Sequence, residues 1–391
     1  MNMRIGINAS FLRKQGTGLG QVTANLIKKI AESSGNKDAE FFLYLEEDVK
    51  LKLPKKTASS AVKFHKRIFL PAYKRDDLIR RIWWERFLLP KKVRKDNCDV
   101  FLSLYQSTTV LSGKTKHLMI VHDLIPKFFP HYLNNGRKKL YQKLVENSIK
   151  KADKLVAISH RTEKDLISHL QIDPKKITVS YIDVDPIYKK KVTQVESQKV
   201  LKKHKLDPGY IYGGGGLEVR KNVESVVRAY KLLLENADKK DKLPKLAIFG
   251  KLLPELAPLV TDLEMLVSQL GLKKQVVILG QVSQADSPAL YANALIFVYP
   301  SFYEGFGLPV LEAMNQGVPV ITSKTSSLPE VGSDSVLYCD PSDVEDLAMV
   351  MKNVLFNDHL KAALSMKGRE RAKHFSWEKF VAKMNNIIKE L

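Results

Sequence analysis

Short apolar runs rich in β-branched residues alternate with longer amphipathic stretches along the chain. In the first half these runs are Arg4–Asn8, Phe41–Leu45, Val100–Leu104, His117–His122, Leu155–Ser159 and Ile177–Ile182. In the second half they are Tyr210–Gly213, Leu246–Gly250, Val276–Leu279, Ile296–Tyr299, Val318–Thr322 and Val336–Cys339. Short strands separated by helical segments are typical of parallel βαβ units, so the pattern predicts an α/β protein.

The alternation begins again after Lys189–Gln194, a polar stretch with the character of a linker. With 391 residues, the chain is long for one hydrophobic core and sufficient for two. We therefore predict two doubly wound parallel-sheet domains, residues 1–190 and 191–370, followed by a terminal helical segment, 371–391. Ligands bind such domains at the carboxyl ends of the strands, and we expect the two domains to face each other across a cleft.

The amino-acid sequence argues against a membrane-spanning, a secreted or a disulfide-stabilised protein. Hydrophobic residues make up 44% of the chain, which is ordinary for a globular protein. No stretch reaches the roughly 18 apolar residues of a membrane span. The first residues look like a strand rather than a secretion signal, so we expect a cytoplasmic protein. Cys98 and Cys339 are the only cysteines, which argues against a disulfide framework or a cysteine-based metal site.

Positive charge is concentrated in one segment. The formal net charge is +22, and Lys50–Lys95 holds 16 basic against three acidic residues, or +13. The same segment contains Phe64, Phe69, Tyr73, Trp83, Trp84 and Phe87. Basic residues mixed with tryptophans suit an anionic membrane surface, where each nearby cation contributes about 1 kcal/mol. Nucleic acid is a competing partner, and a solvated basic face with the aromatic residues in the core is the third interpretation.

Residues 303–314, Tyr-Glu-Gly-Phe-Gly-Leu-Pro-Val-Leu-Glu-Ala-Met, place Glu304 and Glu312 on either side of two glycines. Gly305 and Gly307 allow close approach of a ligand to the backbone. Pro309 suits the first turn of a helix, and exposed amides at a helix start favour phosphate. The segment predicts a site for phosphate and sugar, although a glycine-rich turn with two solvated glutamates is the simpler alternative.

Two other glycine segments are candidates for anion binding. Gly16–Gly20 precedes a helical stretch but lacks both the Gly-Lys-Ser/Thr of a P-loop and the glycine spacing of a dinucleotide fingerprint. It is either a cleft loop that touches an anionic ligand or a plain helix-starting turn. Gly213–Gly216 leads to Arg220 and Lys221, which can neutralise a diphosphate. Two solvated cations beyond a surface turn are the alternative.

Two further segments carry candidate chemistry. His122-Asp123 ends a predicted strand, where ligands bind in wound sheets, although a lone histidine is more often structural. Asp183-Val184-Asp185 is similar to the metal-binding Asp-x-Asp of some sugar transferases. It lies beside Pro186 at the predicted junction of the domains, so metal binding there is the weaker hypothesis.

Taken together, these segments resemble the retaining glycosyltransferases of family 4, which have the GT-B fold. The resemblance spans nearly the whole chain and rests on the order and spacing of Gly18–Gly20, His122–Pro126, Arg220–Asn222, Tyr299–Ser301, Tyr303–Met314 and Phe375–Trp377. It implies that the first domain binds the acceptor and the second binds the nucleotide sugar. It also implies that the terminal helix crosses back to the first domain.

The resemblance implies a role for each motif residue of the second domain. Glu304 would contact the donor sugar's hydroxyls, and Glu312 would hold the ribose hydroxyls of the nucleotide. Lys221, with Arg220, would stabilise the charge of the departing diphosphate. Donor contacts would also come from the glycine-rich loop, at Gly305, Phe306, Gly307 and Leu308.

In the first domain, the resemblance places His122 beside the reacting sugar. Gly18 and Gly20 would close over the diphosphate and the acceptor. The chain departs from many relatives, which carry a further basic residue near Gly215 or Gly216, and we expect Arg220 to compensate.

The implied reaction retains the configuration of the anomeric carbon and requires neither a divalent metal nor a cofactor besides the nucleotide-sugar donor. We expect a hexose donor, with GDP-mannose favoured because Arg-Lys-Asn and His-Asp-Leu-Ile-Pro are similar to mannosyltransferase-like members. The expected acceptor is a lipid-linked glycan or cell-surface polysaccharide, with the enzyme peripheral on the inner face of the membrane. The alternatives are a soluble transferase or synthase with a small or sugar-phosphate acceptor, and a basic nucleic-acid-binding protein. We expect no nucleic-acid partner.

Overall fold

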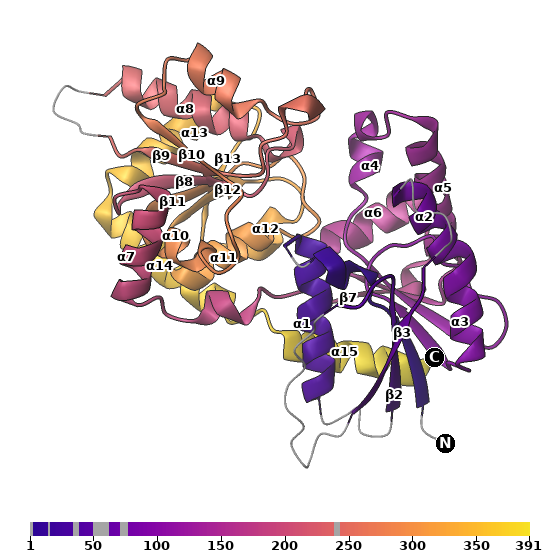
Figure 1. The fold of residues 1–391 in the computed structure, drawn as a ribbon. Helices are drawn as coiled ribbons and strands as arrows, with labels where there is room; N and C mark the ends of the chain where they lie inside the picture. The colour runs from indigo at the N-terminus through magenta and orange to yellow at the C-terminus, as the bar shows by residue number, and fades with distance from the viewer. Residues whose placement is uncertain (1–2, 15, 34–38, 50–61, 71–76, 238–242) are drawn as a thin grey trace. The chain divides into compact units, whose positions relative to one another are not determined.

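The computed structural model describes residues 3–14, 16–33, 39–49, 62–70, 77–237 and 243–391. The chain divides into two compact units (Figure 1). The first consists of Met1–Asp183 and Ser376–Leu391, and the second consists of Val184–Phe375. The division therefore precedes the linker-like residues near 190. A contact explains this, because Gln316 Nε2 donates to the Tyr188 carbonyl at 2.5 Å and so holds that segment to the second unit.

The first unit contains one seven-stranded sheet in the order β3-β2-β1-β4-β5-β6-β7. Its strands are β1 (Met3–Asn8), β2 (Ala39–Leu45), β3 (Lys63–Ile68), β4 (Val100–Ser103), β5 (Lys116–Val121), β6 (Lys154–Ala157) and β7 (Ile177–Val179). Every adjacent pair is parallel. The strand order reverses between β1 and β4, which is where doubly wound sheets bind ligands.

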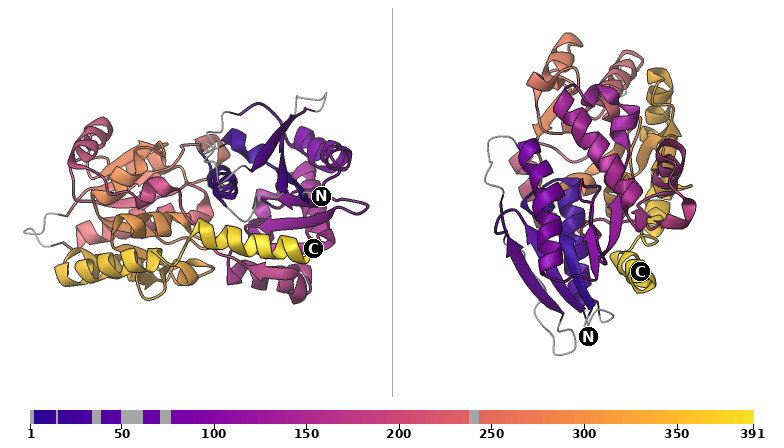
Figure 2. Two further views of the ribbon diagram at one scale, coloured as in Figure 1. Left: turned by 90° about the horizontal axis from the view of Figure 1, so that it is seen from below. Right: turned by 90° about the vertical axis from the view of Figure 1, so that its right-hand side faces the viewer.

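Helices flank the strands of the first unit on both sides (Figure 2). They are α1 (Gly18–Glu32), α2 (Asp77–Trp83), α3 (Leu89–Lys95), α4 (Ile125–Phe128), α5 (Gly136–Lys151), α6 (His160–Leu170) and α15 (Trp377–Glu390). A π-helical turn, Trp84–Leu88, joins α2 to α3. The last helix, α15, lies against α1, where Glu378 forms an ion pair with Lys29. The C-terminal helix thus belongs to the first unit although its sequence follows the second.

The second unit contains a six-stranded parallel sheet in the order β10-β9-β8-β11-β12-β13. Its strands are β8 (Tyr210–Gly214), β9 (Leu246–Phe249), β10 (Val276–Gly280), β11 (Ala294–Tyr299), β12 (Val320–Ser323) and β13 (Leu337–Cys339). Its helices are α7 (Gln194–His204), α8 (Val223–Glu235), α9 (Leu263–Gln269), α10 (Ser287–Ala292), α11 (Leu308–Gln316), α12 (Leu328–Gly332), α13 (Val344–Leu355) and α14 (Asp358–Ala372). The order reverses between β8 and β11, so the loops that follow these two strands lie side by side.

The basic segment is described only in part, because Lys50–Ala61 and Pro71–Asp76 lie outside the described residues. Trp84 is fully buried and donates its indole N–H to the Phe69 carbonyl at 2.9 Å. Trp83 and Phe87 are instead 49% and 55% exposed. The segment thus places some of its aromatic residues in the core and others on the surface. Among the residues that the structure describes, no helix is both long and apolar enough to cross a bilayer.

Candidate active site

The loops after β8 and β11 bring together the charged residues that the sequence singled out in the second unit. Arg220 and Lys221 lie in a short 3-10 helix, Val219–Lys221, that ends at Asn222 in the left-handed conformation. The Asn222 amide donates to the carbonyls of Pro300, at 3.1 Å, and Pro341, at 2.7 Å. These bonds hold the loop that follows β8 against the end of β11.

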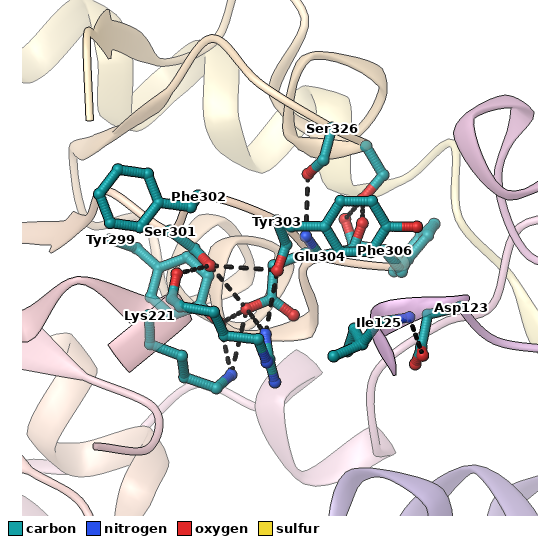
Figure 3. A network of polar contacts seen from close by, with 12 residues as sticks. Asp123, Ile125, Lys221, Tyr299, Ser301, Phe302, Tyr303, Glu304, Phe306 and Ser326 are labelled. Atoms are coloured by element: carbon teal, nitrogen blue, oxygen red, sulfur yellow. Dashed lines mark hydrogen bonds and ion pairs between the residues drawn. The ribbon is translucent and has the colours of Figure 1, made fainter. Parts of the chain in front are cut away.

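Glu304 lies at the centre of a polar cluster formed by Arg220, Lys221, Tyr299, Ser301 and Glu304 (Figure 3). Its Oε1 accepts hydrogen bonds from Arg220 Nη1 at 2.7 Å and from Lys221 Nζ at 3.2 Å. The same oxygen accepts from the Tyr299 hydroxyl at 2.6 Å and the Ser301 hydroxyl at 3.0 Å. Within the described residues, Oε2 receives no hydrogen bond. The Glu304 cluster therefore leaves one carboxylate oxygen for a ligand.

The Glu304 cluster keeps its carboxylate charged. Burial alone would raise the pKa of Glu304, since the side chain is 11% exposed. The positive charges of Arg220 and Lys221, with the hydrogen bonds from Tyr299 and Ser301, outweigh this effect and lower the pKa to about 2. A carboxylate so stabilised is an acceptor of hydrogen bonds and not a proton donor at neutral pH.

Serines after β12 fix the backbone on either side of the Glu304 side chain. The Glu304 amide donates to Ser326 Oγ at 2.9 Å (Figure 3). The Ser327 hydroxyl donates to the carbonyls of Glu304, at 2.9 Å, and Phe306, at 2.8 Å. The loop between β11 and α11 is therefore held rigidly where it turns toward the helix.

The loop enters α11 through Gly307, whose φ of 111° lies in the region that favours glycine. A Cβ at this position would lie 2.7 Å from Leu328 Cδ2. Pro309 stands in the first turn, and Gly317 ends the helix in the left-handed conformation. Pro309 has no backbone N–H, and the Val310 amide donates to the Gly307 carbonyl at 3.0 Å. The Leu308 amide, as the first of the helix, has no carbonyl of a preceding turn to bond to. The helix start at Leu308, next to the loop residues Gly305 and Phe306, is therefore the part of this segment suited to an anion.

Glu312, in the same helix, has a different environment. It is buried, and its Oε2 accepts from the Tyr291 hydroxyl at 3.0 Å. Burial raises the pKa of Glu312 to about 7, and hydrogen bonds from Tyr291 and Tyr188 offset only part of this effect. At neutral pH this carboxyl group is balanced between its neutral and charged forms.

In the first unit, His122 is buried at the end of β5. Its Nε2 lies 2.8 Å from the Leu104 carbonyl, which requires the proton to be on Nε2. Burial lowers the pKa of His122 to about 4, so the imidazole is neutral at pH 7. Gln106 Oε1 accepts from the His122 amide at 3.1 Å.

The other candidates of the first unit are backbone positions or caps. Gly18 and Gly20 lie in the first turn of α1, where the Thr17 hydroxyl caps the Gly20 amide at 3.2 Å. They are thus part of a helix start and not of a separate loop. Asp185 caps the Ile187 amide at 2.9 Å. The described part of the chain contains no group of three His, Cys, Asp or Glu residues arranged for a metal.

Sequence reasoning gave no individual role to Tyr299, Ser301, Asn222 or Ser326. Two signals were present, because Tyr299-Pro300-Ser301 ends an apolar strand and Asn222 follows Lys221 directly. Ser326 has no such signal, since its contact with Glu304 depends on β11 and β12 being neighbours in the sheet.

Comparisons with known proteins match both halves of the chain to glycosyltransferase families. A family model described as Glycosyl transferases group 1 matches residues 195–371, and one described as Glycosyltransferase Family 4 matches residues 19–186. The O-antigen chain mannosyltransferase B of Escherichia coli is 31% identical over 272 residues, which are 69% of each chain. The O-antigen chain mannosyltransferase RfbU of Salmonella typhimurium is 25% identical over 351 residues, 89% of this chain and 90% of that one.

Solved structures share the fold. Sucrose-phosphate synthase from Thermosynechococcus elongatus superposes with a TM-score of 0.74 at 18% identity, covering 99% of this chain and 98% of that one. HepE from Anabaena, in complex with UDP-glucose, gives a TM-score of 0.71 at 16% identity and covers 100% of both chains. The two parallel sheets are those of the GT-B fold that the sequence predicted.

Proposed function

The chain belongs to glycosyltransferase family 4, and on that premise we propose that it transfers a hexose from a nucleotide sugar to a hydroxyl group of a lipid-linked or cell-surface polysaccharide. The observation that carries this proposal is the Glu304 cluster, in which a charged carboxylate lies between two cations at the carboxyl edge of a parallel sheet. A nucleotide sugar has the complementary chemistry, with anionic phosphates and a ring of hydroxyl groups. UDP-glucose bound to Anabaena HepE supports this class of donor.

We assign the reaction to the residues as follows. Glu304 Oε2 accepts hydrogen bonds from sugar hydroxyls, while Lys221 and Arg220 stabilise the charge that develops on the departing diphosphate. The loop amides contact the phosphates, and Glu312 accepts from the ribose hydroxyls. The family resemblance assigns His122 to the reacting sugar, and its imidazole is neutral at pH 7. The acceptor attacks from the face that the diphosphate leaves, and the leaving phosphate takes the acceptor's proton, so that configuration is retained without a divalent metal.

We propose a mannosyl donor, GDP-mannose, because the O-antigen relatives are named mannosyltransferases. A thermal-shift panel of GDP-mannose, UDP-glucose, UDP-galactose and dTDP-glucose tests this, since a ligand at a hundred times its dissociation constant stabilises by about 2.7 kcal/mol. The largest shift is expected with GDP-mannose. A larger shift with a uridine nucleotide would replace the donor but not the class of reaction.

The catalytic assignment is tested by replacing Glu304 or Lys221 with Ala. Each substitution is expected to lower transfer by about a thousandfold or more, the scale of losing a preorganised charge in an active site. Glu224→Gln is the matched control, because Glu224 forms an exposed pair with Arg228, 49% and 47% exposed. Wild-type turnover in either Ala variant would refute the assignment.

We further propose that the enzyme is peripheral on the cytoplasmic face of the membrane. The exposed rings of Trp83 and Phe87 lie edge to face, with centroids 6.4 Å apart. Exposed cations share the helical segment 77–95 and the adjoining α5, namely Lys91, Arg94, Lys95, Arg137, Lys139 and Lys143. Apolar rings beside cations fit the interface of an anionic bilayer.

Vesicle sedimentation tests the membrane proposal. The protein is expected to bind phosphatidylserine vesicles at low salt and phosphatidylcholine vesicles weakly, because its attraction is electrostatic. The double variant W83A/F87A should bind less, whereas F356A, which removes a ring 52% exposed in the second unit, should not. Failure to bind anionic vesicles would favour a soluble transferase with a small acceptor, and tighter binding to DNA or RNA would favour the nucleic-acid alternative.

A further inference from the structure

Tyr299, the last residue of β11, bonds both to a cation and to the carboxylate of the Glu304 cluster. Its side chain is completely buried. Its hydroxyl lies 2.7 Å from Lys221 Nζ and 2.6 Å from Glu304 Oε1 (Figure 3). An ammonium group can only donate hydrogen bonds and a carboxylate can only accept them. The Tyr299 hydroxyl therefore accepts from Lys221 and donates to Glu304 at the same time.

The surroundings of the ring fix the position of this hydroxyl. The ring stacks on Phe297, with centroids 5.9 Å apart. On another side it faces Gly215, where a Cβ would lie 3.0 Å from Tyr299 Cε2 and where φ is 99°. A residue with a side chain at position 215 would thus contact the Tyr299 ring too closely, and its backbone would be strained as well. The glycine-rich turn after β8 therefore leaves room for the Tyr299 ring, and the packed ring fixes the position of its hydroxyl.

Lys221 depends on this hydroxyl. Its ammonium group has two partners in the described structure, the Tyr299 hydroxyl at 2.7 Å and Glu304 Oε1 at 3.2 Å. The shorter of the two bonds is the one to tyrosine. A lysine has several rotatable bonds, so an ammonium group without this bond would sample other positions.

We propose that Tyr299 is a positioning residue, whose hydroxyl holds the Lys221 ammonium group beside Glu304 Oε1 and leaves Oε2 directed to the donor sugar. The inference rests on the proposed function, because it assumes that Lys221 stabilises the diphosphate. Tyr299 itself touches no reacting atom. It acts through Lys221, so its contribution disappears when the ammonium group is absent.

A double-mutant cycle of Y299F and K221M tests this dependence, with Y210F as the matched control. Tyr210 is a buried tyrosine in β8 whose hydroxyl donates to the Leu290 carbonyl at 2.5 Å. Turnover is followed with the nucleotide sugar of the panel above that the wild type uses fastest. Y299F is expected to lower kcat by about tenfold to a hundredfold, the effect of losing one hydrogen bond to a charged group. Y210F is expected to change kcat by less than about threefold, because its hydroxyl bonds only to a neutral carbonyl.

The decisive comparison is made in the K221M background. There Y299F is expected to change kcat by less than about twofold, because residues that act as a unit have non-additive effects. A merely structural role would give the same fold loss in both backgrounds, and that result would overturn the inference. So would a Y299F variant that matches Y210F in turnover.

The same cycle in urea unfolding needs no donor and keeps the two proposals distinguishable. If the wild type uses none of the nucleotide sugars, the proposed function fails, but the unfolding midpoints still report whether Tyr299 and Lys221 are coupled. Non-additive shifts are expected for residues in direct contact. Additive shifts would overturn the role of Tyr299 even in an active enzyme.

Discussion

Replacing Glu304 with Gln removes one negative charge from a buried site that keeps two cations. The amide has nearly the same size as the carboxylate, and its oxygen can still accept from Tyr299 and Ser301. Arg220 and Lys221 would then lose the charged carboxylate to which both of them bond, which is the costly way to break a buried ion pair. The substitution therefore isolates the electrostatic part of the Glu304 cluster.

The size of the effect follows from the pKa of Glu304. It falls from the ordinary 4.5 to about 2, and a difference of one pKa unit corresponds to about 1.4 kcal/mol, so the charged form contributes about 3 kcal/mol to stability. Because the folded pKa is lowered, this contribution is complete above pH 4.5 and is lost as the pH falls through 2. At pH 3 about half of it should remain.

The assay is urea unfolding followed by far-ultraviolet circular dichroism at pH 7, 5, 4 and 3. Trp83, Trp84 and Trp377 are the only tryptophans, and all three belong to the first unit. Tryptophan fluorescence therefore reports on the first unit, while the dichroism also reports on the second, which contains Glu304. The E304Q variant should lose about 3 kcal/mol in the dichroism transition at pH 7 and about half of that at pH 3.

Two results would refute the reasoning. An E304Q variant as stable as the wild type at pH 7 would mean that the ion pairs contribute nothing net. A loss of the same size at pH 7 and pH 3 would mean that the effect is one of packing, because only the charge is titrated away. The surface control E224Q should stay within about 0.5 kcal/mol of the wild type at pH 7, as exposed pairs usually do.

Three other substitutions or titrations follow from the same structure. The pKa of Glu312 is raised to about 7, so the wild type loses stability as the pH rises from about 4.5 to 7. The E312Q variant has no carboxyl group to ionise and escapes this loss. In urea unfolding, its free energy of unfolding relative to that of the wild type should therefore rise by about 3 kcal/mol between pH 4.5 and 8. The G307A substitution places a Cβ 2.7 Å from Leu328 at a φ of 111°, and it should lower the free energy of unfolding by about 1–3 kcal/mol. The control G136A adds a Cβ that has no other atom within 4 Å, and it should leave the free energy of unfolding unchanged. The pKa of His122 is lowered to about 4, so folding favours the neutral imidazole and its contribution to stability is lost as the pH falls from about 6.5 to 4. In the folded protein the His122 imidazole resonances should titrate near pH 4, and a midpoint near 6.5 would contradict the burial.

Most strands could be predicted from apolar runs, because central parallel strands are buried on both faces. The exception is β3, Lys63–Ile68, which was not predicted. Its sequence, Lys-Phe-His-Lys-Arg-Ile, is mostly polar, and it pairs only with β2 at the edge of the sheet. An edge strand needs less apolar surface, so its hydrophobic signal is weak.

The charged residues of the site could be predicted, but their pairing could not. Arg220, Lys221 and Glu304 were each expected at strand ends, with the cations directed to the diphosphate and the glutamate to the sugar. In the structure, both cations bond to Glu304 Oε1 itself. That contact requires β8 and β11 to be neighbours, and strand order is a long-range property that local sequence patterns do not contain.

Glu304 and Glu312 belong to one motif, but their carboxyl groups differ in pKa because their surroundings differ. Two cations lower the pKa of Glu304, whereas burial beside Tyr188 and Tyr291 raises that of Glu312. A hydrolytic pair would need one carboxylate free to attack and one acid to protonate the leaving group. Glu304 is charged, but four donors occupy its Oε1, which weakens it as a nucleophile and suits it to binding. Glu312 is readily protonated but bonds to tyrosine hydroxyls, so ribose hydroxyls that donate to it would favour its charged form and release a proton on binding. The motif therefore suits two ends of one donor better than an acid and a nucleophile.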